Sequence, residues 1–412
     1  MQEFKGIDYI KIDIANHYGL DKLNWDQRIL WVDTNHDKLF DLIKEAEEPA
    51  QYYSAVKALS AAEEGIPNGH GVALDATSSG IQILSALTGD EKAATLCNLV
   101  NTGKREDIYT SVFKKMLQKA DGNPNLKRDY VKKAIMTSCY GSEATPKKVF
   151  GEGALLDAFE QTVSEELPLV WEANKLMLDL WNPNASSYYW VMPDGFTVRT
   201  KVMAPSKETI RFNGIVYEIT RYVNAPTKKG RALGANMTHS VDGMIVREVA
   251  RLCKFDKRRI DYILKALKEY GSCRNAFEDK EEQDLFVSEP IRRLLHVGSL
   301  SGFYSVRILE EMTPADIREM CIKRPYILRS LLQEYPTDSE EPFDLLTIHD
   351  SFIALPNHCN FIRKAYRNEL VKIARSNLME FLLEQIAGKP ISINKGNPDL
   401  WKKIQDAEYA LS

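Results

Sequence analysis

Residues 72–89 read VALDATSSGIQILSALTG, and this stretch decides the fold. Its first five residues predict a short buried strand, because apolar side chains surround a single carboxylate, that of Asp75. The remainder predicts a helix with a serine at its cap and Gly89 at its stop. A strand that ends on an aspartate and runs directly into a helix holds that carboxylate rigidly at the edge of a sheet.

A second stretch, FDLLTIHDSFIALP at 343–356, places another carboxylate in a similar setting. It predicts two strands that bend at His349 and Asp350. Each aspartate alone gives weak support, because an Asp after a strand is more often a helix cap or a turn former. Two such carboxylates together can hold two Mg²⁺ ions in nucleotidyl transfer. His349 would then position a primer or product phosphate, although a purely structural turn histidine fits equally well.

The third stretch, RDYVKKAIMTSCYG at 128–141, predicts a helix that carries cations. At about 1.5 Å per residue, one face of this helix would be roughly 18 Å long, enough to lie along a nucleoside triphosphate. Two cations at its start suit phosphates, a phenol at its end suits base and sugar, and a final glycine lets the backbone approach closely. An amphipathic helix with a solvated basic edge is the alternative. The residues that this interpretation uses are Arg128, Lys132, Met136, Tyr140 and Gly141.

Composition sets broad limits. The 412 residues, 44% hydrophobic and 27% charged, predict a globular protein of two or three domains. The six cysteines form no CxxC pair, which disfavours a zinc site or a disulfide framework and favours a reducing, cytosolic setting. Neither a membrane span nor a signal peptide is expected. The net charge of −4 is unusual for a nucleic-acid binder, although residues 113–150 are locally basic.

The rest of the chain alternates between helical and strand patterns. Residues 1–65 and 105–120 predict amphipathic helices, and the GNP at 122–124 predicts a break after the second of them. Residues 187–232 alternate and contain two turn signals, which predicts β-hairpins. Helical periodicity then returns at about 241–335, and a long helix is expected at about 358–387.

The three stretches resemble motifs A, B and C of the single-subunit RNA polymerases of bacteriophages and mitochondria, within the polymerase I superfamily. DxxxSGIQ, RxxxKKxxMTxxYGS and HDSF are all present and in order. NMTHSVDG at 236–243 and KGNPDLWKKIQDAEYALS at 395–412 resemble further segments of that family.

The resemblance implies an α+β, mostly helical right-hand fold with palm and fingers, a small antiparallel palm sheet and a β-hairpin region. The implied parts are a helical palm-associated segment at 1–65, the palm at 66–90, the fingers at 91–235 with a specificity-loop-like region at 187–232, and a second palm part at 236–412 with a foot-like C-terminal segment.

The resemblance also implies roles for individual residues. Asp75, the Ala76 backbone and Asp350 would be the ligands of two Mg²⁺ ions, and Arg128 and Lys132 would hold the triphosphate. Tyr140 and His239 would sense the ribose 2′-hydroxyl, and Tyr109 would lie near the incoming nucleotide. The implied partners are NTPs, a DNA template and the RNA product, in the cytoplasm of an infected host cell.

The choice between RNA and DNA synthesis rests on three positions. Related DNA polymerases usually place a glutamate where this chain has Gly80, and that glutamate blocks a 2′-hydroxyl; glycine leaves room. Met136 with Thr137, and Ser351 after the His-Asp pair, also depart from the DNA polymerase pattern. RNA synthesis is therefore expected. The alternatives are a DNA polymerase and a catalytically inactive nucleic-acid-binding subunit.

Two departures from the family shape the remaining expectations. The chain begins close to motif A, so we expect it to be one half of a split polymerase whose second polypeptide supplies the N-terminal and thumb regions. His239 and Asp350 are 111 residues apart, so residues 254–338 are expected to be a helical insertion that either binds a partner or is a plain appendage. The hairpin at 197–232 is expected to contact the template or promoter.

Overall fold

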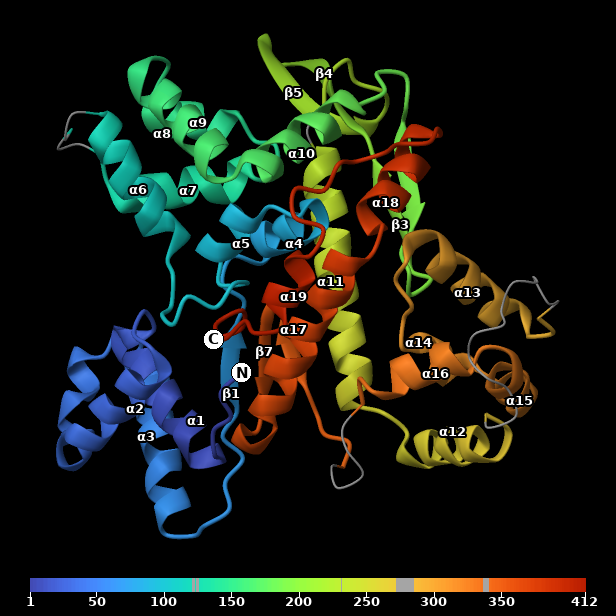
Figure 1. Cartoon of the computed structure of the whole chain (residues 1–412). Helices are drawn as coiled ribbons and strands as arrows, with labels where there is room; N and C mark the ends of the chain where they lie inside the picture. Colours follow the sequence, from blue (N-terminus) through green and yellow to red (C-terminus); the bar gives the residue numbers. More distant parts are fainter. Residues whose placement is uncertain (121–122, 124–125, 231, 272–284, 336–340) are drawn as a thin grey trace.

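The computed structural model describes the chain except for residues 121–122, 124–125, 231, 272–284 and 336–340. The described residues are mostly helical, and their strands form three small antiparallel sheets, in agreement with the expected α+β class (Figure 1). Within these ranges no helix is both long and apolar enough to cross a membrane.

A three-stranded sheet lies at the centre of the molecule, with strand order β1-β7-β6. Its strands are β1 (Val72–Asp75), β6 (Leu346–Ile348) and β7 (Ser351–Ala354), so the two strands expected around the His-Asp pair are confirmed. β1 and β7 run antiparallel, with Asp75 opposite Ser351. Two segments that lie far apart in the sequence therefore meet in this sheet (Figure 1).

Three helices pack together beside the sheet: α4 (Ser79–Thr88), α11 (Ala232–Cys253) and α17 (Cys359–Arg375). Phe352 of β7 packs edge-on against Tyr366 of α17, with ring centroids 5.5 Å apart. Gly89 ends α4 in the left-handed conformation, as predicted. The predicted serine cap is confirmed in position, since Ser78 is the N-cap residue of α4, but its side chain makes no capping hydrogen bond. Ser78 has a φ of 68° and donates its hydroxyl to Tyr109 Oη instead.

The N-terminal region is helical, as expected, but its longest helix, α3 (Pro49–Glu63), is shorter than the helical pattern of residues 1–65 indicated. The region also contains α1 (Gly6–Ala15), a π-helical turn at Asn16–Leu20 and α2 (Trp25–Thr34). α3 begins at Pro49, since proline suits the first helical turn and not the interior. These helices share a small core, and Trp25 joins them to the main body by stacking on Tyr409 at 5.3 Å.

The next region consists of helices that stand beside α4. α6 begins directly after Asp107, whose carboxylate accepts hydrogen bonds from the backbone N–H groups of Tyr109 and Thr110. The helix expected at 105–120 is therefore confirmed, whereas most of the GNP break lies outside the described residues. The helices are α5 (Glu91–Leu96), α6 (Ile108–Lys119), α7 (Arg128–Ser138), α8 (Ala144–Phe150), α9 (Ala154–Glu166) and α10 (Pro168–Asp179).

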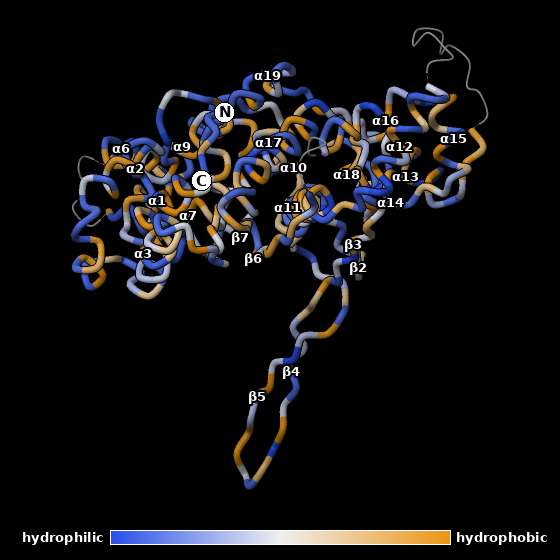
Figure 2. Tube along the Cα trace, turned by 90° about the horizontal axis from the view of Figure 1, so that it is seen from below, coloured by the Kyte–Doolittle hydropathy of each residue, from blue (hydrophilic) through white to orange (hydrophobic). Residues whose placement is uncertain are grey.

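Two β-hairpins follow, as predicted. β2 (Ser187–Val191) pairs with β3 (Thr197–Lys201), and β4 (Met203–Phe212) pairs with β5 (Ile215–Asn224). The β4–β5 ribbon projects far out of the body (Figure 2). α11 starts at Ala232, about nine residues before the predicted start of the helical pattern.

The region expected to be an insertion is a cluster of helices on the opposite side of α11 from the N-terminal helices (Figure 1). A further correction concerns the helix expected at 358–387. It is interrupted at Ser376, whose hydroxyl accepts a hydrogen bond from the Leu378 N–H and so starts a new helix. The elements are α12 (Lys257–Tyr270), α13 (Glu289–Ser301), α14 (Arg307–Glu311), α15 (Pro314–Lys323), α16 (Pro325–Leu332), α18 (Leu378–Ala387) and α19 (Leu400–Ile404).

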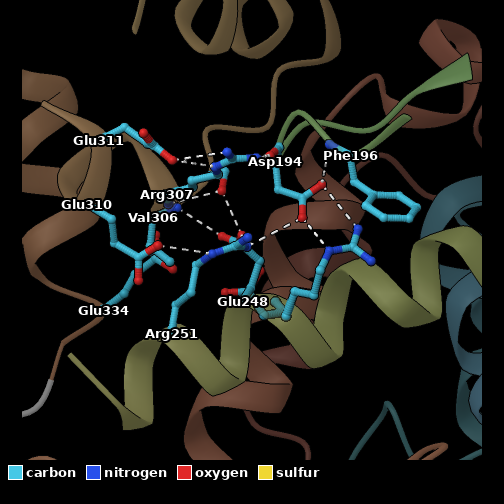
Figure 3. A network of polar contacts seen from close by, with 12 residues as sticks. Asp194, Phe196, Glu248, Arg251, Val306, Arg307, Glu310, Glu311 and Glu334 are labelled. Atoms are coloured by element: carbon cyan, nitrogen blue, oxygen red, sulfur yellow. Dashed lines mark hydrogen bonds and ion pairs between the residues drawn. The ribbon is translucent and has the colours of Figure 1, made fainter. Parts of the chain in front are cut away.

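A buried polar network joins α11 to the β2–β3 turn and to α14 (Figure 3). Asp194 of the turn, which is fully buried, accepts hydrogen bonds from Arg247 at 2.5 and 3.1 Å. Glu248, also fully buried, accepts hydrogen bonds from Ser305 Oγ at 2.6 Å and from the Val306 N–H at 2.9 Å. The network therefore fixes the helical cluster to α11 and to the β2–β3 hairpin.

Candidate active site

The two aspartates predicted as metal ligands are adjacent. Asp75 ends β1, Asp350 lies in the turn before β7, and the Ala76 N–H donates a hydrogen bond to the Asp350 carbonyl at 3.2 Å. His349 takes a φ of 56°, a left-handed conformation that is uncommon for a residue with a Cβ. The turn therefore exposes His349 while it directs the chain back into β7.

The donors at this position suit Mg²⁺, which takes one or two carboxylates and completes its shell with water and substrate phosphate. Asp75 is exposed and Asp350 is half-buried, so both carboxylates are accessible. The Ala76 carbonyl already accepts a hydrogen bond from the Ser78 N–H at 3.0 Å and has one lone pair left. In the described part of the chain no cluster of three or more His, Cys, Asp or Glu side chains forms a complete metal cage.

A third carboxylate, Asp242 on α11, lines the same cavity. Burial and, after it, the negative charge of Asp350 raise its pKa to about 6. This concentration of negative charge is favourable for a cation and costly without one. The resemblance at NMTHSVDG, residues 236–243, implied no role for this aspartate.

The cationic helix is α7, and it ends earlier than predicted. Arg128, Lys132 and Met136 follow one another along α7, but the helix stops at Ser138, so Tyr140 lies in the turn beyond it. Gly141, with a φ of 85°, closes this turn by donating its N–H to the Ser138 carbonyl at 2.9 Å. Gly141 is absent from the cavity lining, so its structural role is the turn and not close approach to a ligand.

Arg128 is not free in this structure. Its guanidinium donates to Thr110 Oγ1 at 2.8 Å and to Asp107 Oδ2 at 2.5 Å, across the start of α6. Burial acts to raise the pKa of Asp107, but hydrogen bonds from Thr110 and Arg128 lower it below the ordinary value. The Lys132 ammonium lies 5.7 Å from the centre of the Tyr109 ring and is otherwise exposed to the cavity.

The residues predicted to sense the sugar are in contact. The rings of Tyr140 and His239 stack at 5.0 Å with an interplanar angle of 21°. The Tyr140 hydroxyl fills the space above Gly80, where any Cβ would overlap it. The prediction that Gly80 leaves room for a 2′-hydroxyl therefore needs correction, because the phenol of Tyr140 takes up that room. Burial, together with the nearby Asp242, raises the pKa of Tyr140, so its hydroxyl stays protonated.

One cavity of about 670 Å³ connects all of these groups. The sequence did not single out Lys22 and Arg105, which also line it. Lys22 lies between the turn at Asn16–Leu20 and α2, and Arg105 lies just before α6. Neither residue belongs to a strand or helix whose periodicity would have indicated that it faces the cavity. Of the residues predicted for the site, those on the lining are Asp75, Ala76, Gly80, Tyr109, Arg128, Lys132, Met136, Tyr140, His239, His349 and Asp350.

Comparison with known proteins agrees with this geometry. Residues 2–150 match the profile of the family described as DNA-dependent RNA polymerase. Over this range the chain is similar to DNA-dependent RNA polymerases. The matched range contains Asp75 and the whole of α7, and thus two of the three stretches on which the resemblance was based.

Similar polymerases come from phages and from organelles. The chain is 25% identical over 333 residues to the DNA-directed RNA polymerase of Pseudomonas phage phiKMV, covering 65% of this chain and 41% of that protein. It is 31% identical over 169 residues to a probable DNA-directed RNA polymerase of Neurospora crassa, covering 36% and 18%. It is 25% identical over 312 residues to the mitochondrial DNA-directed RNA polymerase 1 of Arabidopsis thaliana, covering 60% and 32%. The alignments therefore span well under half of each of these relatives.

Proposed function

We propose that this chain carries the nucleotidyl-transfer site of a DNA-directed RNA polymerase. The observation that carries the proposal is the convergence, on one cavity, of two strand-end aspartates and the cations of α7. In template-directed RNA synthesis the RNA 3′ hydroxyl attacks the α-phosphate of an NTP and pyrophosphate leaves. The named relatives, all DNA-directed RNA polymerases, favour RNA over DNA as the product.

Asp75, the Ala76 carbonyl and Asp350 would hold two Mg²⁺ ions. When bound, these would lower the pKa of the attacking hydroxyl and neutralise the leaving pyrophosphate. Lys132 would neutralise the triphosphate, and Lys22 and Arg128 would join it if their ion pairs with Asp21 and Asp107 opened. His349, exposed in its turn, would contact the primer or product phosphate.

The sugar would bind beside Tyr140 and His239. The Tyr140 hydroxyl lies next to Gly80 in the cavity and has no hydrogen-bond partner among the described residues, so it can bond a ribose 2′-hydroxyl. A deoxyribose would not provide this hydrogen bond, which is the physical basis of discrimination. Tyr109, whose hydroxyl accepts from Ser78, would pack near the incoming nucleotide.

A DNA template and an RNA product need a surface that encloses them. The phage relative is more than twice as long as the region aligned with it. We propose that a second polypeptide supplies the remaining duplex-holding region. Primed extension by this chain alone should then be short and distributive, and adding that polypeptide should lengthen the products. Long products from this chain alone would disprove the need for it.

The direct test is primed RNA extension with Mg²⁺ by Asp75→Asn and Asp350→Asn. Each removes one ligand charge, and we expect extension to fall by about three orders of magnitude or more while the melting temperature stays near that of the unmodified chain. Asp344→Asn is the matched control, because Asp344 is an exposed residue that pairs with Lys254 at 2.9 Å outside the cavity. Near-normal extension by both active-site variants would refute the proposal and favour an inactive nucleic-acid-binding subunit.

A further inference from the structure

Two arginines line the cavity, and their side chains differ in their hydrogen-bond and ion-pair partners. Arg128 is engaged by Asp107 and Thr110. Arg105 is half-buried and lines the same cavity, yet among the described residues no carboxylate lies within ion-pair distance of it. Its one side-chain hydrogen bond runs from Nε to Ser412 Oγ at 3.2 Å, so both terminal nitrogens of the guanidinium remain available.

The surroundings of Arg105 hold it in place without neutralising it. Its backbone N–H donates to Asn24 Oδ1 at 3.0 Å, which ties the loop before α6 to the start of α2. The carboxylates of Asp21, Asp107 and Asp75 are near enough to favour its charge, but burial lowers its pKa overall. A partly desolvated cation without a counter-ion is costly, and a bound anion would remove that cost.

The neighbours of Arg105 indicate which kind of anion it would bind. Arg105 bonds Ser412, and the Ser412 N–H in turn donates to the Asp75 carbonyl at 2.9 Å, so Arg105 lies beside the strand that carries a predicted metal ligand. Lys22 also lines this part of the cavity, two residues before Asn24. Arg105, together with Lys22 if its ion pair with Asp21 opened, lines the cavity that also contains the predicted metal ligand Asp75, and this arrangement of charges suits a diphosphate group.

We propose that Arg105 binds the β- and γ-phosphates of the nucleotide and therefore the leaving pyrophosphate. This inference rests on the proposed function and adds to it a residue outside the cationic helix. Arginine suits the role because its planar fork can donate two parallel hydrogen bonds to a phosphate. Asp107 holds Arg128 in this structure, whereas both terminal nitrogens of Arg105 are available for the phosphates.

The test is equilibrium binding of MgATP, magnesium pyrophosphate and AMP to the full chain, measured by calorimetry. Arg105→Gln should weaken MgATP and pyrophosphate binding by about ten- to a hundredfold and leave AMP binding unchanged. Arg105→Lys should weaken it less, because it keeps the charge but not the fork. Lys104→Gln is the matched control, since Lys104 is an exposed neighbour that pairs with Glu106 at 3.4 Å, and this variant should bind all three ligands normally.

A second measurement covers the case in which the glutamine variant does not fold. Phenylglyoxal should modify Arg105 in the unmodified chain, and pyrophosphate, but not AMP, should protect it, as read by peptide mass spectrometry. If MgATP binds Arg105→Gln normally while Lys132→Gln weakens it, the inference is wrong and the proposed function stands. Equal loss of AMP and MgATP binding, or absence of protection, would also overturn the inference. If the unmodified chain binds no triphosphate at all, both fail.

Discussion

Gln82 has a structural role that its place in the SGIQ motif did not reveal. Its side chain is fully buried, and its amide group donates to the carbonyls of Cys97 and Ala410, each at 2.9 Å. Its carbonyl oxygen accepts the hydroxyl of Tyr366 at 2.8 Å. One glutamine therefore connects α4, the end of α5, α17 and the segment beside β1.

We predict that Gln82→Leu destabilises the protein by about 2–4 kcal/mol, because it leaves several buried polar groups without a partner. Urea unfolding followed by circular dichroism measures this change. Gln118→Leu, on the exposed face of α6, is the control and should change stability by no more than about 0.5 kcal/mol. A stable Gln82→Leu variant would show that these hydrogen bonds contribute little to the fold.

A second prediction at the residue scale concerns Tyr140. Tyr140→Phe keeps the stack on His239 but removes the hydroxyl above Gly80, so we expect a loss of about 1–3 kcal/mol in the preference for ribonucleotides. Competing incorporation of ATP and dATP measures it, and overall extension should persist. Gly80→Ala should shift the preference too, because its methyl group forces the phenol aside. Unchanged sugar preference in both variants would exclude Tyr140 as the sensor.

The site could be predicted where local pattern and chemistry coincide. Asp75 and Asp350 end apolar runs, and Lys132 sits at helical spacing from Arg128, so sequence alone indicated them. Lys22, Arg105 and Asp242 enter the cavity only because distant segments fold together, which no local spacing reports. The placement of the Tyr140 ring over Gly80 likewise depends on where α7 ends.

At the scale of elements, the β4–β5 ribbon is solvent-exposed along nearly its whole length. Two of its cations are neutralised by the ribbon itself, Lys207 by Glu218 at 3.1 Å and Arg221 by Glu208 at 3.4 Å. Arg211 remains as the cation that could bind a phosphate without first losing an ion pair. The hypothesis of template or promoter contact therefore depends more on shape and apolar contacts near the tip than on charge.

We predict that replacing residues 207–220 by a short Gly-containing turn leaves the melting temperature within about 2 °C, because the removed residues are exposed and contact little besides each other. Template-dependent initiation should fall, while MgATP binding stays unchanged. Gel-shift and calorimetry measure the two effects. Normal initiation by the shortened chain would refute the assignment of the ribbon to template or promoter contact.

The network between α11 and the β2–β3 turn predicts a pH dependence of stability. Burial acts to raise the pKa of Asp194, but hydrogen bonds and charge from Arg247 lower it below its ordinary value of 3.8. A carboxyl group whose pKa is lower in the folded protein than in the unfolded chain stabilises the folded state at pH values above the unfolded-state pKa. This stabilisation is lost as the pH falls through the folded-state pKa. Stability should therefore drop below about pH 4. Asp194→Asn should flatten that drop in urea unfolding measured from pH 6 to 3, and an equally steep drop in the variant would point to other carboxylates.

For the whole molecule, elements with strong periodicity or clear turn residues were predictable, including α4, α6, both hairpins and the strands around the His-Asp pair. Breaks inside helices were not, since Pro49 and Ser376 interrupt patterns that read as continuous. The proposed insertion is helical, but its attachment to the core through Glu248 and Asp194 depends on buried charges that a sequence reads as surface residues. The division into palm, fingers and insertion remains a prediction.

The pairing of β1 with β7 also determines when during translation the site can form. Asp75 and its partner Ser351 are separated by roughly 280 residues, so the first carboxylate leaves the ribosome tens of seconds before the second at typical elongation rates. During this interval the nascent chain exposes an unpaired strand edge at β1, a feature that favours aggregation or chaperone binding. Because the strand from the last quarter of the chain completes the sheet, a ribosome that stalls before this strand releases a product that has the cationic helix and Asp75 but lacks Asp350.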